Sequence, residues 1–464
     1  MKKLIHLSLT TTMLITAAHA AEDLSSMFSE GKTSGQVRMF YVDRQYQGTL
    51  GVDTHRNAMT LGGHLKFATD DYKGLSAGAA YYGVNEIHWF DYGTGAKHDP
   101  SLSGSEVTNY AILGEGYLKY DLSDFGSKTA GKFGYQLYDT PMMGGDDARA
   151  MRNLFEAYRL TNSDLESVDF QLAQVRSIAY GTFSNIYRHD GTSGAKSILA
   201  STSGYAAGAP KQFNTTTGEY VNLGEAVVGK RTAGITNAQM KFKSEHFSAT
   251  LSNDYAWDLY NTFYADVGAK WNCLLSDSIH PFVNAQVIKQ NDVGGSYMQD
   301  SAMAGDGKID SLFWAAKVGF SVAGFTAYGA YSQTSTNDAS SSAAYSSAIL
   351  SQFGGMPAYT QGMVTRHQFL ARTNAWKAVV SYNFKSLGTD LSTTAYYASF
   401  DMDALSGYGV ARTATEPGFD IKYNPALVDN LNLRFRGNFP RKFAESATGN
   451  LGWNEYRLIA NYNF

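Results

Sequence analysis

Two acidic and two basic side chains lie close together in one short segment of the sequence, at Asp146, Asp147, Arg149 and Arg152. Charged residues this close in a loop commonly pair with one another and hold the loop in shape. Around a narrow aqueous passage, the same groups would create a field that orients dipolar solutes. One loop can do both, and the sequence leaves both interpretations open.

Motifs for catalysis or for binding a cofactor do not stand out. The ten histidines are scattered, and no His-Glu-x-x-His sequence pairs two of them as zinc ligands. The stretches Gly294-Gly295 and Ala304–Lys308 lack the lysine spacing of a P-loop and the ordered acidic ligands of an EF-hand, so we expect a surface loop there. The sequence therefore predicts no enzyme, no cofactor and no metal.

Basic residues recur in segments where apolar and polar side chains alternate. In Leu431–Phe439, Leu433 and Phe435 fall on one face of a strand, and Arg434 and Arg436 fall on the other. The same pattern surrounds four further basic residues, namely Arg38, Lys66, Lys119 and Arg457. On a soluble sheet these cations would simply face solvent, but Arg or Lys against lipid costs about 2–4 kcal/mol. In a membrane strand they must therefore face a water-filled interior.

The C-terminal segment Asn454–Phe464 has the clearest pattern of a membrane strand. Tyr456, Leu458 and Tyr462 alternate with polar residues, and the chain stops on Phe464, like the strands by which outer-membrane barrels are recognised for assembly. The composition agrees, because 46 Gly, 31 Tyr and 26 Phe stand against only 8 Pro. Only every second residue of a membrane strand faces lipid, so a mean hydropathy of −0.28 is compatible with a membrane protein. We predict an all-β fold, a transmembrane antiparallel β-barrel.

The turns divide the chain into many short segments. Polar links such as Ser163-Asp164 and Asp429-Asn430 predict periplasmic turns, and the stretches Gly191–Gly224 and Thr334–Arg366 predict longer extracellular loops. At roughly 25 residues for a strand and its share of connections, the chain holds about 18 strands, with 16 as the alternative. A barrel of that size is expected to enclose an aqueous channel.

The N-terminus resembles a secretory signal. Lys2 and Lys3 precede an apolar stretch that is too short to span a bilayer, and Ala18-His19-Ala20 is a small-x-small cleavage sequence. We predict cleavage after Ala20, which leaves residues 21–464 as one exported barrel domain.

The single Cys273 cannot form an internal disulfide, and we place it in a strand as a packing residue. A formal charge of −4 is too mild to indicate nucleic acid as a partner.

Several segments resemble the OprD-like family of outer-membrane porins. Within Tyr135–Ser163, Asp147-Ala148-Arg149 matches the family's Asp-x-Arg, while its proline and glycine are missing around Asn153 and Ala157. Two further segments resemble the family's first and last strands, namely Gly35–Arg44 and Asn454–Ile459. The family's polar motif in the seventh loop is not visible, which leaves the substrate open.

This resemblance implies an 18-stranded barrel, monomeric or weakly trimeric, whose third loop folds inward to form a constriction. It implies passive diffusion of small hydrophilic solutes and ions, favouring carboxylate-bearing ones such as amino acids and small organic acids. By position, Asp146, Asp147, Arg149 and Arg152 would lie at the constriction. The candidates for a basic ladder along the lumen are Arg38, Lys66, Lys119, Arg434, Arg436 and Arg457.

Two other functions remain open. A structural or adhesive surface protein could use the barrel only to display its long loops. A sugar-selective porin of equal strand number would instead show a track of lumen aromatics. A receptor with an N-terminal plug does not fit, because only Ala21–Ser34 precede the first predicted strand. We expect the chain in the Gram-negative outer membrane, with lipid and the barrel assembly machinery as its partners.

Overall fold

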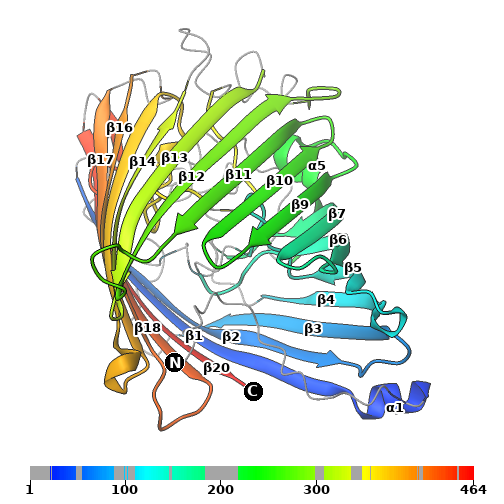
Figure 1. Cartoon of the computed structure of the whole chain (residues 1–464). Coiled ribbons are helices and arrows are strands. Elements are labelled where there is room, and N and C mark those ends of the chain that lie inside the picture. Colours follow the sequence, from blue (N-terminus) through cyan, green and yellow to red (C-terminus); the bar gives the residue numbers. More distant parts are fainter. Residues whose placement is uncertain are drawn as a thin grey trace.

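Strands joined end to end around one curved wall make up most of the computed structural model (Figure 1). It describes residues 21, 23–48, 55–87, 99, 102, 110–145, 149–182, 218–297, 308–335, 347–355, 357–404, 406, 411–446 and 449–464. The first ten strands are β1 (Lys32–Gln47), β2 (His55–Ala68), β3 (Leu75–Glu86), β4 (Tyr110–Asp121), β5 (Thr129–Gln136), β6 (Leu154–Asn162), β7 (Val168–Ala179), β8 (Val221–Asn222), β9 (Ile235–Lys243) and β10 (Phe247–Ala256). The others are β11 (Tyr260–Lys270), β12 (Ile279–Asp292), β13 (Asp310–Val322), β14 (Phe325–Thr334), β15 (Thr373–Asn383), β16 (Leu391–Met402), β17 (Arg412–Tyr423), β18 (Leu431–Asn438), β19 (Ala444–Ser446) and β20 (Gly449–Asn463).

Within the residues that the structure describes, two short α-helices accompany the strands, α1 (Leu24–Ser29) and α5 (Leu223–Val228). Single 3₁₀ turns occupy Ser123–Phe125, His367–Phe369 and Phe384–Leu387. No helix in the described part of the chain is long and apolar enough to cross a bilayer.

The wall closes on itself. Of the twenty strands in the described part of the chain, β8 and β19 are short additions, and each of the other eighteen pairs antiparallel with its neighbours. The ring is completed where β1 pairs with β20, from Gln36 opposite Asn463 to Gln47 opposite Gly452. The predicted antiparallel barrel is therefore confirmed, with 18 strands and not 16.

The two faces of each strand differ as the sequence pattern predicts. On β20, Tyr456, Leu458 and Tyr462 leave 38–48% of their surface exposed, whereas Glu455 and Arg457 are fully buried. An exposed apolar face and a covered polar face are the reverse of a soluble sheet. In a membrane barrel this arrangement places lipid outside and polar groups inside.

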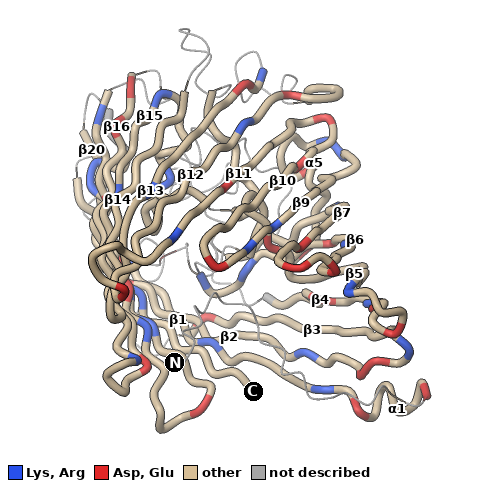
Figure 2. The backbone as a smooth tube through the Cα atoms, in the orientation of Figure 1, with Lys and Arg blue, Asp and Glu red and all other residues tan. Residues whose placement is uncertain are grey.

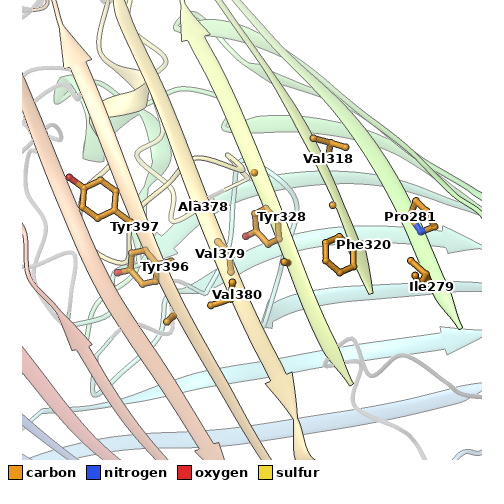
Figure 3. Close-up of a pocket in the computed structure, with 14 residues that line it drawn as sticks. Ile279, Pro281, Val318, Phe320, Tyr328, Ala378, Val379, Val380, Tyr396 and Tyr397 are labelled. Atoms are coloured by element: carbon orange, nitrogen blue, oxygen red, sulfur yellow. The ribbon is translucent and has the colours of Figure 1, made fainter. Parts of the chain in front are cut away.

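A shallow apolar hollow on the wall from β12 to β16 belongs to this lipid-facing side (Figure 3). Its volume is about 840 Å³, and its lining includes Val318, Phe320 and Val380. Gly329 and Ala378 lie opposite each other in the β14–β15 pairing, and the missing side chain of the glycine and the single methyl group of the alanine leave the hollow open. The hollow shows that this part of the outer wall is continuously apolar.

The connections at the two ends of the barrel have very different lengths. One end carries short turns, including the predicted polar turns at Ser163-Asp164 and Asp429-Asn430. This is the periplasmic end in barrels of this class.

The prediction that Cys273 lies in a strand is wrong, because β11 ends at Lys270. Cys273 instead pairs with Ser276 in the β11–β12 turn, where its backbone N–H bonds to Ile279 O at 2.9 Å.

The long β14–β15 loop, residues 335–372, departs from expectation. We predicted an extracellular loop over Thr334–Arg366, but most of the described residues between 347 and 372 are buried, including Ile349, Leu350 and Phe353. The stretch is rich in small polar residues, yet Ile349 packs with the buried Ile288 and Phe313 of the wall, and Phe353 packs with the buried Phe155 and Ile178. The loop therefore turns back into the barrel.

The interior near the extracellular end is packed with loop side chains. One cluster joins Leu223 and Val227 of α5 to Phe155 of β6, Ile178 of β7 and Phe353 of the β14–β15 loop. A second joins residues 149–153 of the β5–β6 loop to β1, β3 and β6, through Met151, Phe40, Val84 and Leu154. Residues 191–217 of the predicted loop Gly191–Gly224, and residues 304–307 of the stretch near Gly294, lie outside the described residues.

Candidate functional site

The six basic residues predicted to line the lumen lie on strands of one stretch of the wall, from β18 through β20, β1 and β2 to β4. Figure 2 marks the Lys and Arg positions along the backbone in blue. Arg434 and Arg436 come from β18, Arg457 from β20, Arg38 from β1, Lys66 from β2 and Lys119 from β4. Arg436 lies directly opposite Arg457 in the β18–β20 pairing, and Arg38 lies opposite Asn461 in the β1–β20 pairing. The antiparallel register thus brings these predicted residues, which are far apart in sequence, onto one wall.

Carboxylates on the same wall each contact more than one cation. Asp420 accepts from Arg434 Nε at 2.8 Å and lies 3.6 Å from Arg436 Nε. Glu115 lies 2.9 Å from Lys66 Nζ and 3.8 Å from Lys132 Nζ. At both carboxylates, positive charge exceeds negative charge.

The third carboxylate, Glu455, holds the β5–β6 loop (residues 137–153). Its Oε1 lies 3.1 Å from Arg149 Nη2, and its Oε2 lies 2.6 Å from Arg44 Nη2. Arg457 also donates to Oε1, while Asp99 lies 3.3 Å from Arg44. The ionised side chains of this cluster are at most 2% exposed, so their charges must compensate one another.

Arg149 is thus a contact between the loop and the wall. Burial lowers the pKa of its guanidinium, as do the like charges of Arg457 and Arg44, while Glu455 opposes the shift. Pairing within the loop was one of the two interpretations that the sequence left open. The structure instead joins Arg149 to Glu455 of β20, which lies 306 residues further along the chain.

Arg152 turns the other way and stays within the loop. Its Nη2 lies 3.6 Å from Asp139 Oδ2, and the two side chains are 32% and 62% exposed. Asp139 also accepts from Gly145 N at 2.8 Å, and Arg152 lies against Gly145, where an added Cβ would come within 2.5 Å of its Nη2. Asp146 and Asp147 lie outside the described residues. Of the four predicted constriction residues, the two described ones therefore have separate partners.

The β14–β15 loop is attached to the wall at β15 and β17, beside the strands that carry Arg434 and Arg436. Lys377 Nζ of β15 donates to Gln361 O at 2.6 Å. Glu416 of β17, which is fully buried, accepts from Thr365 N at 2.8 Å, from Thr365 Oγ1 at 2.6 Å and from Met363 N. One carboxylate thus binds several donors from a single turn of the loop.

The two loops also touch each other. Gly144 N of the β5–β6 loop donates to Phe353 O of the β14–β15 loop at 2.8 Å. A Cβ on Gly355 would come within 2.2 Å of the Met142 backbone, so the chains can approach this closely only because position 355 is glycine. Together the loops form one connected structure inside the wall.

Sequence reasoning missed several of these residues for identifiable reasons. Glu115 follows Gly114, where the β3–β4 register shifts, and this bulge breaks the alternation that would have assigned its face. Glu416 was missed because its main partners are backbone N–H groups, which leave no trace in the sequence. Arg44 lies in the predicted first strand, but its partner Glu455 is determined by the β1–β20 pairing that closes the barrel. Asp139 and Lys132 lie outside the alternating segments that the sequence singles out.

The described residues contain no group of His, Cys, Asp or Glu side chains suited to a metal ion. A Gly-x-Ser-x-Gly sequence at Gly74–Gly78 leads directly into β3. It therefore lacks the strand-to-helix turn that exposes a serine nucleophile in hydrolases.

A closed barrel with an apolar outside and a charged inside defines a membrane channel protein. The sequence profile described as "outer membrane porin, OprD family" matches residues 27–464. The chain belongs to this family of outer-membrane porins, which are channels and not enzymes.

Solved structures of similar fold come from Pseudomonas aeruginosa. OccK9 (OpdG) is 16% identical, with a TM-score of 0.69 over 95% of this chain and 99% of that one. OpdK with vanillate is 15% identical, with a TM-score of 0.68 over 94% and 99%. OccK2 (OpdF) in complex with glucuronate is 14% identical, with a TM-score of 0.65 over 95% and 99%. No curated protein sequence matches the chain.

Proposed function

We propose that this porin conducts small hydrophilic solutes by passive diffusion and prefers those that carry a carboxylate. The observation that carries the proposal is the surplus of cations over carboxylates on the wall from β17 to β5. Asp420 faces Arg434 and Arg436, and Glu115 faces Lys66 and Lys132. Such a wall attracts anions and raises their local concentration in a narrow passage.

Arg434 and Arg436 are the side chains we expect to contact a passing carboxylate. They share the single carboxylate of Asp420, and 24% and 15% of their side chains remain exposed on the inner face of the wall. A guanidinium with an incompletely used donor set favours a planar carboxylate that supplies the missing acceptors. The ligands named with OpdK and OccK2, vanillate and glucuronate, both carry carboxylates, which supports this solute class.

The exposed pair Asp139 and Arg152 is our proposed constriction contact within the β5–β6 loop, because these two loop charges keep access to the interior. Asp146 and Asp147 stay predictions for the same constriction. Arg149 contributes by holding the loop in position, since it is itself fully buried. Signal cleavage after Ala20, assembly through Phe464, and a monomer or weak trimer also stay predictions.

A sugar-selective track fits the interior less well. Sugars stack on open aromatic faces. Several tyrosine rings of the interior instead have a lysine over the face, with Lys132 Nζ 3.7 Å from the Tyr117 centroid and Lys317 Nζ 4.4 Å from that of Tyr359. These rings are therefore covered on one side by cations.

The test is the ion preference of single channels in planar bilayers, taken from the reversal potential in a salt gradient. We expect an anion preference in the wild type and a loss of most of it in R434Q/R436Q. The matched control K270Q/K385Q removes the same charge at two exposed positions near the short turns and should keep the preference. A cation-selective wild type, or an unchanged R434Q/R436Q, would contradict the basic wall. A folded barrel that gives no current would favour a surface protein.

A further inference from the structure

The N-terminal helix α1 is fixed at the periplasmic end of the barrel. Asp23 and Ser26 cap it reciprocally, with Ser26 N donating to Asp23 Oδ1 at 2.7 Å and Asp23 N to Ser26 Oγ at 2.9 Å. The β2–β3 turn holds it, because Asp70 N donates to Met27 O at 2.9 Å. A helix this short is unstable alone, so these contacts determine its place.

The side chains of α1 divide into two sets. Leu24, Met27 and Phe28 fall on one arc of the helix, and the three serines fall on the other. Met27 is only 4% exposed, whereas Leu24 and Phe28 are each 59% exposed. The barrel thus covers one edge of the apolar arc and leaves two large apolar side chains more than half exposed.

The exposed arc adjoins the lipid-facing surface of the wall. A Cβ on Gly31, just after α1, would come within 2.4 Å of the Phe67 ring, so this ring covers the chain where it enters β1. Phe67 and its neighbour Leu65 on β2 are 37% and 55% exposed, on the lipid-facing side.

On the side of β1 that pairs with β20, another aromatic ring covers the strand. A Cβ on Gly35 would come within 2.5 Å of the ring of Phe464, the terminal aromatic residue. The outer face at the β1–β20 closure is therefore apolar down to its periplasmic edge. In Figure 1, α1 lies beyond the ends of β1 and β2 and does not cross the barrel opening.

We propose that α1 is a lipid anchor, with Leu24 and Phe28 inserted at the interface of the periplasmic phospholipid leaflet. The helix continues the apolar outer face past the last residues of the strands. Its serines and Asp23 then face water. Short amphipathic helices bind bilayer interfaces through such a division of faces.

The test measures the depth of four α1 positions in vesicles of phosphatidylethanolamine and phosphatidylglycerol. Single cysteines at Leu24, Phe28, Ser25 and Ser29 are introduced into a C273S background and spin-labelled. Accessibility to oxygen, which concentrates in lipid, is compared with accessibility to a water-soluble nickel complex. Heat-modifiable electrophoretic migration verifies that each labelled barrel is folded.

We expect L24C and F28C to favour oxygen at least several-fold more than the matched controls S25C and S29C. Equal, water-like values at all four positions would overturn the proposal. Labels at L24C and F28C that become inaccessible to both reagents as the protein-to-lipid ratio rises would instead indicate a second copy of the chain. Because this readout needs no conductance, it does not depend on the proposed solute preference.

Discussion

The two loops inside the barrel are both held by a buried wall carboxylate, but in opposite ways. The β5–β6 loop supplies a side chain, Arg149, to Glu455. The β14–β15 loop supplies mainly backbone N–H groups, from Met363 and Thr365, to Glu416. The first attachment depends on one loop residue, while the second depends on the path of the loop backbone.

This difference determines where each attachment can be broken. A single substitution in the β5–β6 loop removes its cation, but the β14–β15 loop keeps its backbone donors whatever side chains it carries. On the wall side the two are alike, because each has one carboxylate. The comparison therefore predicts unequal effects for loop substitutions.

The largest effect is expected from E455Q. This substitution removes the negative charge among Arg44, Arg149 and Arg457, and leaves buried guanidiniums with too little compensation. Removing one partner from a buried ion cluster costs about 3–5 kcal/mol. Urea titration of the folded barrel in lipid should show a loss of this size.

The control for E455Q is D121N. Asp121 pairs with Lys119 at 3.2 Å, but both side chains are about one-third exposed, at 29% and 34%. An exposed pair contributes roughly 0–1 kcal/mol, so D121N should be nearly neutral. If the two variants lost equal stability, the buried cluster would not be the stabilising contact that its burial indicates.

An intermediate effect is expected from R149M, which breaks the same contact from the loop side. Glu455 keeps Arg44 and Arg457, and the like-charge repulsion on Arg149 disappears, so the stability loss should be only about 1–2 kcal/mol. The released loop should nevertheless widen the passage. We expect a higher single-channel conductance in R149M, and no change in the exposed control K385M.

Conductance that stays at the wild-type level in R149M would show that the packing of Met151 and Leu154 alone holds the loop. In that case the contact between Arg149 and Glu455 would not be needed to hold the β5–β6 loop, and neither loop would depend on a single side chain.

The barrel itself was predictable because alternation is local. In Leu431–Phe439 the period of two assigns a face to each residue, and lipid then determines which face is outside. The shared inner face of Arg434 and Arg436 follows from this, while the count of about 18 strands came from the chain length at roughly 25 residues per strand and its connections. The terminal strand ending at Phe464 follows from the alternation too.

The partners inside the barrel were not predictable, because they are set by the closed shape. Arg149 and Glu455 meet only after the ring has formed. The inward path of residues 347–372 was hidden by their small polar composition, although Ile349 and Phe353 carry the apolar surface that draws the loop inside. The loop anchor Glu416 binds backbone, which no residue pattern reveals.

The smallest effect is expected from T365V, and it tests the second half of the comparison. The substitution removes the bond from Thr365 Oγ1 to Glu416 Oε2 at 2.6 Å and leaves the N–H donors of Thr365 and Met363 in place. Losing one hydrogen bond to a charged group costs about 1.5–3 kcal/mol of stability when the charged group is left without a partner. Glu416 keeps its backbone donors, so the stability loss should be only about 1 kcal/mol. Conductance should stay at the wild-type level.

The matched substitution on the wall is E416Q. It should increase current noise, because it weakens every hydrogen bond between Glu416 and the loop at once. If T365V opened the channel as R149M does, the β14–β15 loop would also depend on one side chain, and the backbone attachment would not be what holds it.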